Sequence, residues 1–242
     1  MKTTFGMSVW IICLTILIAC SHGENRIGKM TLHYAVTQSN NDVVELLLIK
    51  GADVNAKDGE ALQTPLHYAA FQDNKDIVHL LIAKGAEINA KDYSGATPLY
   101  YAAYNNKREI ADILIEKGAH VNAETDGGHT PLEAAVTRNN KDVVILLIEK
   151  GANVNVSNFG TSPLHEAVRQ NNMAIVELLL AKGAYVNLQE PGGMTPLHYA
   201  VSKCREDIAR LLIAKGADVK LKNKNNRTAM DYITGCGPSF LK

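Results

Sequence analysis

The chain has 242 residues, with 25 basic and 25 acidic side chains and a formal net charge of +0 at pH 7. This balance argues against a protein that holds nucleic acid through its phosphates, because such proteins depend on an excess of basic residues. Hydrophobic residues make up 46% of the chain, which is enough for an ordered core.

The N-terminal segment has the pattern of a secretory signal. Lys2 is followed by a mostly apolar run from Phe5 to Ala19, and small residues come next. The run is shorter than the roughly 20 residues that span a bilayer, so an uncleaved membrane helix is the less favoured alternative. A buried first helix is less favoured still, because the run is apolar on every face.

Two cleavage patterns compete at the end of this run. The residues Leu17-Ile18-Ala19-Cys20 resemble a bacterial lipobox, in which the cysteine is acylated and becomes the new N-terminus. This pattern predicts a signal peptide over residues 1–19, lipidation at Cys20 and a short linker over 20–28. Ser21-His22-Gly23 instead suits an ordinary signal peptidase, with cleavage after residue 23 and a freely secreted or periplasmic protein.

The remainder of the chain is built from internal repeats. The phrase Thr64-Pro65-Leu66-His67-Tyr68-Ala69 returns at residues 195–200, and variants of it recur between them. Its leucine falls at positions 32, 66, 99, 132, 164 and 197, with Met230 closing the series. A Gly-Ala pair keeps the same spacing at 51, 85, 118, 151, 183 and 216. A period of 32 to 34 residues predicts stacked units that bury each other's apolar faces.

These motifs resemble the ankyrin repeat over residues 29–242, with six repeats and a partial seventh as a C-terminal cap. The resemblance implies an all-α repeat solenoid in which each repeat is a helix-turn-helix followed by a hairpin loop. It also implies a monomeric, non-enzymatic module that binds a protein partner and carries no cofactor and no metal.

Local sequence signals support the same units. Thr64 is expected to cap a first helix that Pro65 opens, and Gly85 to end the second helix. Between the helices the family usually has a left-handed glycine. The residues at that turn here are Ser39, Asp73, Asn106, Asn139, Asn171 and Cys204. Asp and Asn tolerate that conformation better than most residues, whereas Cys204 does not obviously fit.

The recurring polar residues are expected to be structural. The histidines His33, His67, His165 and His198 come from separate repeats, too far apart for shared metal ligation. The resemblance implies that they bond to neighbouring backbone groups instead. The loop asparagines are expected to tie each hairpin to the next repeat; they are Asn55, Asn89, Asn122, Asn155 and Asn187. No catalytic motif is recognisable, so we expect no enzyme.

The four cysteines predict neither a zinc site nor a disulfide framework, because they are scattered and form no C-x-x-C pair. Cys204 and Cys236 hold nearly equivalent positions one repeat apart. Such positions are expected to lie beyond the 7 Å limit for a disulfide unless the cap bends inward. We therefore favour unpaired thiols.

The resemblance places the partner against the hairpin tips and the concave face of the first helices. Exposed aromatic and basic residues there are the usual hot spots of an interface. The matching positions are Phe71, Gln72, Tyr93, Tyr101, Tyr104, Asn105, His129, Arg138, Phe159 and Arg169. For Phe71 and Tyr101, covering the core between repeats is an equally weighted alternative.

Together the patterns predict an exported, lipid-anchored binding scaffold of the bacterial cell envelope. Two alternative roles remain open. One is a host-directed effector of a host-associated bacterium. The other is an envelope accessory or immunity protein for a toxin or a stress enzyme.

Overall fold

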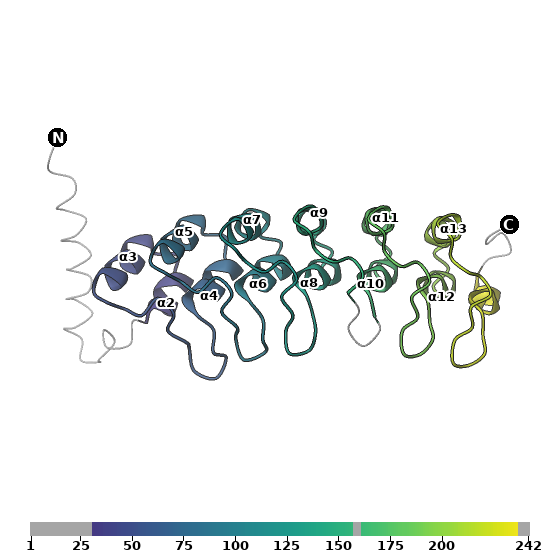
Figure 1. Cartoon of the computed structure of the whole chain (residues 1–242), viewed down its shortest axis with the longest axis horizontal. Coiled ribbons are helices and arrows are strands. Elements are labelled where there is room, and N and C mark those ends of the chain that lie inside the picture. The colour runs from purple at the N-terminus through teal and green to yellow at the C-terminus, as the bar shows by residue number, and fades with distance from the viewer. Residues whose placement is uncertain (1–30, 157–160, 237–242) are drawn as a thin grey trace.

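In the computed structural model, which describes residues 31–156 and 161–236, the chain forms an elongated stack of helix pairs (Figure 1). The first helices of the pairs lie in one row with the long loops below them, and the second helices form the other row. The first helices are α2 Leu32–Thr37, α4 Pro65–Phe71, α6 Pro98–Tyr104, α8 Pro131–Thr137, α10 Pro163–Arg169 and α12 Pro196–Ser202. The second helices are α3 Asn41–Ile49, α5 Lys75–Ala83, α7 Arg108–Glu116, α9 Lys141–Glu149, α11 Met173–Ala181 and α13 Glu206–Ala214. No strand occurs in the described part of the chain, which confirms the predicted all-α repeat solenoid.

The first helices of repeats two to six begin as the sequence predicts. Thr64 is the N-cap of α4, Pro65 is its first residue, and the Thr64 hydroxyl and His67 ring form a capping box. The first repeat lacks the proline, and there the helix starts one residue later. Thr31 itself becomes the N-cap, and its hydroxyl accepts a hydrogen bond from Tyr34 N at 3.3 Å.

Most of the predicted turn residues are left-handed. Ser39, Asn106, Asn139, Asn171 and Cys204 all have φ between 52° and 60°. The prediction is wrong for Asp73, which does not share this conformation. There Gln72 leaves α4 in an extended conformation, with ψ of −178°, so the chain reaches α5 without a left-handed residue.

The apolar core runs the length of the stack between the two rows of helices. The repeat leucines, such as Leu66, Leu99 and Leu164, are fully buried, and the small residues Ala69 and Ala102 let the rows approach closely. Because each repeat covers its neighbour, the core is continuous from α2 to the C-terminal cap.

The loop asparagines connect successive repeats, as predicted. Asn89 Nδ2 donates to the carbonyl of Gly118 at 3.0 Å, and Asn89 Oδ1 accepts from His120 N at 2.8 Å. The same pair of bonds is made by Asn55, Asn122, Asn155 and Asn187. Each loop is thereby fastened to the end of the next repeat's second helix.

Neighbouring loops also touch directly. Asp126 N donates to the carbonyl of Ser94 at 2.9 Å. A Cβ on Gly95 would lie 2.7 Å from Asp126 N, and Gly95 has φ of +76°. Only glycine fits this close approach without strain.

The C-terminal cap corrects the expectation for the cysteines. The partial seventh repeat forms a 3₁₀ helix, η2 Ala229–Gly235, and a disulfide joins Cys204 to Cys236 with a Cα–Cα distance of 5.4 Å. The two positions are not equivalent in space. Cys204 lies in the left-handed turn after α12, whereas Cys236 lies in extended backbone directly after η2 and is brought back toward α12. That geometry falls within the usual disulfide range.

The predictions for the N-terminus concern residues outside the described ranges. These are the signal peptide 1–19, the alternative cleavage after 23, Cys20 and the linker 20–28, and they stay predictions. Among the residues that the structure describes, no helix is long and apolar enough to cross a bilayer.

Candidate protein-binding surface

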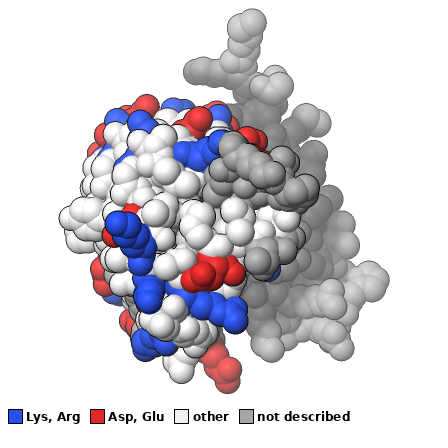
Figure 2. Space-filling model, turned by 90° about the vertical axis from the view of Figure 1, so that its right-hand side faces the viewer, with Lys and Arg blue, Asp and Glu red and all other residues white. Residues whose placement is uncertain are grey.

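The surface formed by the first helices and the loops that precede them, here called the inner face, carries the predicted partner-binding residues. Figure 2 looks at the stack from its C-terminal end, and in this view basic and acidic side chains are interspersed among uncharged residues. This mixture at the end of the stack matches the zero net charge of the chain.

A ladder of histidine and tyrosine rings runs through the inner face. The ring of His67 meets the ring of Tyr101, in the next repeat, edge to face at 5.8 Å. The same contact joins three further pairs at 5.6 to 6.3 Å: His33 with Tyr68, His165 with Tyr199, and His198 with Tyr232. The sequence contains the signal for this ladder, because each of these tyrosines comes two residues after its repeat leucine or after Met230. The ladder was not among the predicted features.

The histidines have the structural role expected of them. Thr64 N donates to His67 Nδ1 at 3.0 Å, so the proton is on Nε2, which donates to the carbonyl of Ala96 at 3.1 Å. The ring thus ties its own helix to the next loop. Burial lowers the pKa of His67, His165 and His198, which keeps these rings neutral near pH 7. His33, His165 and His198 make the same kind of bond to the carbonyls of Gln63, Met194 and Arg227.

Three of the predicted binding residues expose large aromatic surfaces. Phe71 at the end of α4 is 52% exposed, Tyr93 in the loop between α5 and α6 is 75% exposed, and Tyr104 at the end of α6 is 37% exposed. The guanidinium of Arg138 lies 4.7 Å from the centre of the Tyr104 ring. This cation–π contact holds Arg138 across repeats three and four.

Three other predicted residues use their polar groups within the fold. The Tyr101 hydroxyl donates to Asp92 Oδ2 at 2.7 Å and accepts from Gln63 Nε2 at 2.6 Å. Burial, followed by the bond to Asp92, raises the pKa of Tyr101. Gln72 Nε2 donates to the carbonyl of Thr37 at 2.8 Å, and Asn105 Nδ2 donates to the carbonyl of Tyr101 at 2.8 Å. For Tyr101 the structure thus supports the alternative role in the packing between repeats.

The remaining predicted residues lie further along the stack. His129 is exposed at the start of α8. Arg169 at the end of α10 lies 5.3 Å from the centre of the Tyr199 ring. Phe159 lies outside the described residues.

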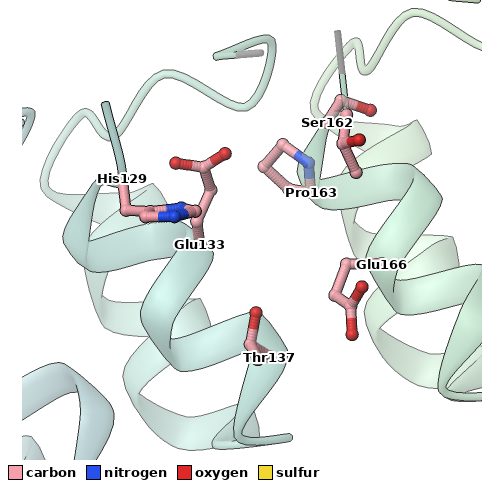
Figure 3. Close-up of a pocket in the computed structure, with 7 residues that line it drawn as sticks. His129, Glu133, Thr137, Ser162, Pro163 and Glu166 are labelled. Carbon is pink, nitrogen blue, oxygen red and sulfur yellow. The ribbon is translucent and has the colours of Figure 1, made fainter. Parts of the chain in front are cut away.

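A cavity of about 280 Å³ opens on the inner face between α8 and α10 (Figure 3). Its lining residues are His129, Glu133, Thr137, Thr161, Ser162, Pro163 and Glu166. His129 is the member of this set predicted above as a partner-binding residue. Glu133 is 9% exposed, and its Oε2 accepts from Thr130 N at 2.8 Å in a capping box. Burial raises the pKa of Glu133, because it disfavours the charged carboxylate.

Within residues 31–156 and 161–236, no three side chains among His, Cys, Asp and Glu come together in a way that could hold a metal ion. The inner face therefore offers aromatic rings, two helix-borne glutamates and hydrogen-bonding groups as its means of recognition.

Comparison with known proteins decides the family. The family model described as "Ankyrin repeats (3 copies)" matches residues 32–125, 66–158, 120–190 and 156–223. The chain belongs to the ankyrin-repeat family. Ankyrin-repeat domains typically mediate protein–protein interaction, so a protein-binding role agrees with the inner face described above.

Two solved ankyrin-repeat structures resemble this one closely. The ankyrin-repeat domain of Bcl-3, described as a unique member of the IkappaB protein family, is 33% identical with a TM-score of 0.75; the match covers 84% of this chain and 93% of that one. The human ASB11 ankyrin-repeat domain is 25% identical with a TM-score of 0.75, over 87% of this chain and 93% of that one. A comparison with curated proteins found no match.

Proposed function

We propose that this ankyrin-repeat protein is a non-enzymatic binding scaffold that captures a protein partner on the inner face of repeats two to four. The observation that carries the proposal is the group of exposed rings Phe71, Tyr93 and Tyr104, with Arg138 stacked on the last of them. Large aromatic side chains and arginine dominate interface energetics, and these rings have nothing in their own fold to cover them fully.

The test replaces Phe71 and Tyr104 together by alanine and measures capture of the partner identified by crosslinking to the wild-type protein. We expect binding at least about tenfold weaker, because two hot-spot side chains are removed. Tyr185→Ala is the matched control, since Tyr185 is 62% exposed and lies after α11, far from repeats two to four. Unchanged affinity in the double variant, with its helix content retained, would move the binding surface elsewhere.

We further propose that the protein is exported and held on the cell envelope by lipid on Cys20. The apolar run and the Leu17 to Cys20 pattern support this location. The disulfide between Cys204 and Cys236 also supports it, because disulfides persist mainly in oxidising compartments outside the cytosol.

Intact mass of the membrane-fractionated protein tests the anchor. A mass that starts at Cys20 and includes acyl chains, and that is lost in Cys20→Ala, is the expected result. A mass that starts at Glu24 without lipid would instead identify a freely secreted or periplasmic binder, and the partner would then be sought among soluble proteins.

A further inference from the structure

The interface between α8 and α10 departs from the ring ladder of the other repeats. At four interfaces a histidine of one repeat meets a tyrosine of the next. Between α8 and α10 the histidine position is Glu133 and the tyrosine position is Glu166. Between α6 and α8 the tyrosine position is Ala134, but Tyr100 holds the histidine position and stacks on Tyr104 at 6.4 Å. Among the described residues, only the interface between α8 and α10 replaces both rings by carboxylates. The cavity opens at this interface.

The two glutamates reproduce only part of the bonding of the ring pair: Glu133 accepts from Thr130 N as His67 accepts from Thr64 N, but the bond to the next repeat is not reproduced. A histidine Nε2 donates to a loop carbonyl of the next repeat, whereas an ionised carboxylate only accepts hydrogen bonds. The residue at that loop position is Thr161, and it lines the cavity. The cavity is therefore rich in acceptors, and a ligand that brings hydrogen-bond donors suits it best.

Glu133 has unused capacity directed at this space. Both of its hydrogen bonds, from Thr130 N and from the Thr130 hydroxyl, end on Oε2. No hydrogen bond within the described residues ends on Oε1, and this oxygen is not among the buried atoms that lack a partner, so it is open to the cavity. In Figure 3 the Glu133 carboxylate projects from α8 toward Pro163, and Glu166 extends from α10 further along the groove between the two helices, nearer the level of Thr137. A donor that enters the cavity can therefore form a charge-assisted hydrogen bond with this oxygen.

The nearby arginines are engaged on either side of the cavity. Arg138 lies over the Tyr104 ring in repeat three, and Arg169 lies over the Tyr199 ring in repeat six. Arg169 Nε also lies 3.8 Å from Glu166 Oε2, at the outer limit of an ion pair, and Gln170 Nε2 donates to Glu166 Oε1 at 2.8 Å. His129 also lines the cavity, and its side chain is not without a partner. The charge that faces the cavity from both helices is therefore mainly that of carboxylates.

We propose that this cavity, here called the glutamate socket, receives an arginine side chain of the protein partner. The inference rests on the proposed binding function of the inner face. A guanidinium carries five N–H donors in one plane, so it can reach acceptors on both walls at once, and its flat shape replaces the missing ring. Lysine offers a point charge with a smaller span of donors, and we expect it to bind less well.

The direct test uses blocked pentapeptides with the purified protein. Gly-Gly-Arg-Gly-Gly, its citrulline counterpart and its lysine counterpart are each titrated to about 10 mM, which detects a Kd of about 1 mM, while amide chemical shifts are recorded. We expect the arginine peptide to move the resonances of Thr130 to Glu133 and of Ser162 to Glu166, and the neutral citrulline peptide to leave them unchanged. Equal effects of arginine and citrulline, or no shifts at the socket, would overturn the proposal. Equal binding of lysine would overturn the choice of arginine.

Conservative variants connect those shifts to the two carboxylates. Glu133→Gln retains the capping box, because glutamine serves there as well as glutamate, and Glu166→Gln retains the acceptor for Gln170. Each variant is expected to weaken arginine-peptide binding about tenfold, as loss of a charge-assisted pair would. Glu177→Gln on the exposed face of α11 is the matched control and should bind as the wild type does. Binding that survives both socket variants would overturn the proposal.

A second pair of substitutions separates this proposal from the proposed function. Glu133→His with Glu166→Tyr rebuilds the ring pair of the other interfaces and should close the socket while keeping the fold. We expect this double variant to weaken partner capture about tenfold, the effect expected when the arginine loses its contact with a glutamate. If capture is unchanged by this variant but falls in Phe71→Ala with Tyr104→Ala, the inner face binds the partner and the socket proposal is wrong. If neither variant affects capture, the proposed function fails as well, and the peptide titration still reports on the socket alone.

Discussion

Reducing the disulfide between Cys204 and Cys236 should destabilise the C-terminal end of the stack without unfolding the central repeats. The two cysteines are 32 residues apart in sequence. Chain entropy for a closed loop of that length gives the crosslink a stabilising effect of about 3.7 kcal/mol at 25 °C. The loop contains α13 and most of the cap, so the effect falls on the last repeat.

The end of the stack depends on this crosslink because it lacks two of the supports that the central repeats have. Lys220 stands where the other repeats have the loop asparagine that fastens to the next repeat. Moreover, η2 is a 3₁₀ helix, whose hydrogen-bond geometry is poorer than that of an α-helix. In a linear array, terminal units open independently of the centre, so the effect should be local.

Hydrogen exchange read out by mass spectrometry, with and without reductant, measures this effect. We expect exchange in α13 and η2 to become faster by up to roughly 500-fold on reduction, and exchange in α6 to α9 to change little. Cys236→Ser should show the faster exchange in both conditions, which controls for other effects of the reductant. Identical exchange of oxidised and reduced protein in α13 and η2 would refute the reasoning.

Three further changes test other parts of the structure. Leu99→Ala, at a fully buried position in a central repeat, should lower the free energy of unfolding by about 3–5 kcal/mol in a denaturant titration; a loss below 1 kcal/mol would contradict the continuous core. Gly95→Ala forces a left-handed alanine against Asp126, so we expect a loss of about 1–3 kcal/mol in the same assay, and no loss would disprove the close loop contact. The pKa of Glu133 is higher in the folded than in the unfolded state, so the folded state binds the carboxyl proton more tightly. The free energy of unfolding therefore falls as the pH rises from the unfolded pKa through the folded pKa. At pH 7 the Glu133→Gln variant should therefore have a higher unfolding temperature than the wild type. Well below pH 4 the two unfolding temperatures should be equal. A lower unfolding temperature of the variant at pH 7 would show that the fold stabilises the carboxylate.

Much of the fold could be predicted because every repeat uses the same local signals. The period of Leu66, Leu99 and Leu132 located the helix pairs, and Thr64-Pro65 located the start of each first helix. The hydrogen bonds of the histidines and loop asparagines followed from the family resemblance, and the structure confirms them.

What could not be predicted depends on how one repeat lies against the next. The disulfide was misjudged because equal spacing was taken to mean equal position, whereas the 3₁₀ helix brings Cys236 back toward Cys204. Tyr101 could be read as a binding residue until its bonds to Asp92 and Gln63 were seen. The glutamate socket was missed for the same reason, because Glu133 and Glu166 come from different repeats and only the stacking brings them together.

The position of the glutamate socket within the array is itself informative. Departures from the repeat pattern at the ends have a structural cause, since terminal units have a neighbour on one side only. The interface between α8 and α10 has neighbours on both sides, yet it places two carboxylates where four other interfaces place a histidine and a tyrosine. The substitution costs the array a ring contact and the hydrogen bond from a histidine to the next loop, and it leaves a cavity in their place. Such a cost in the middle of a regular stack is what a recognition site for a donor-rich partner group would explain.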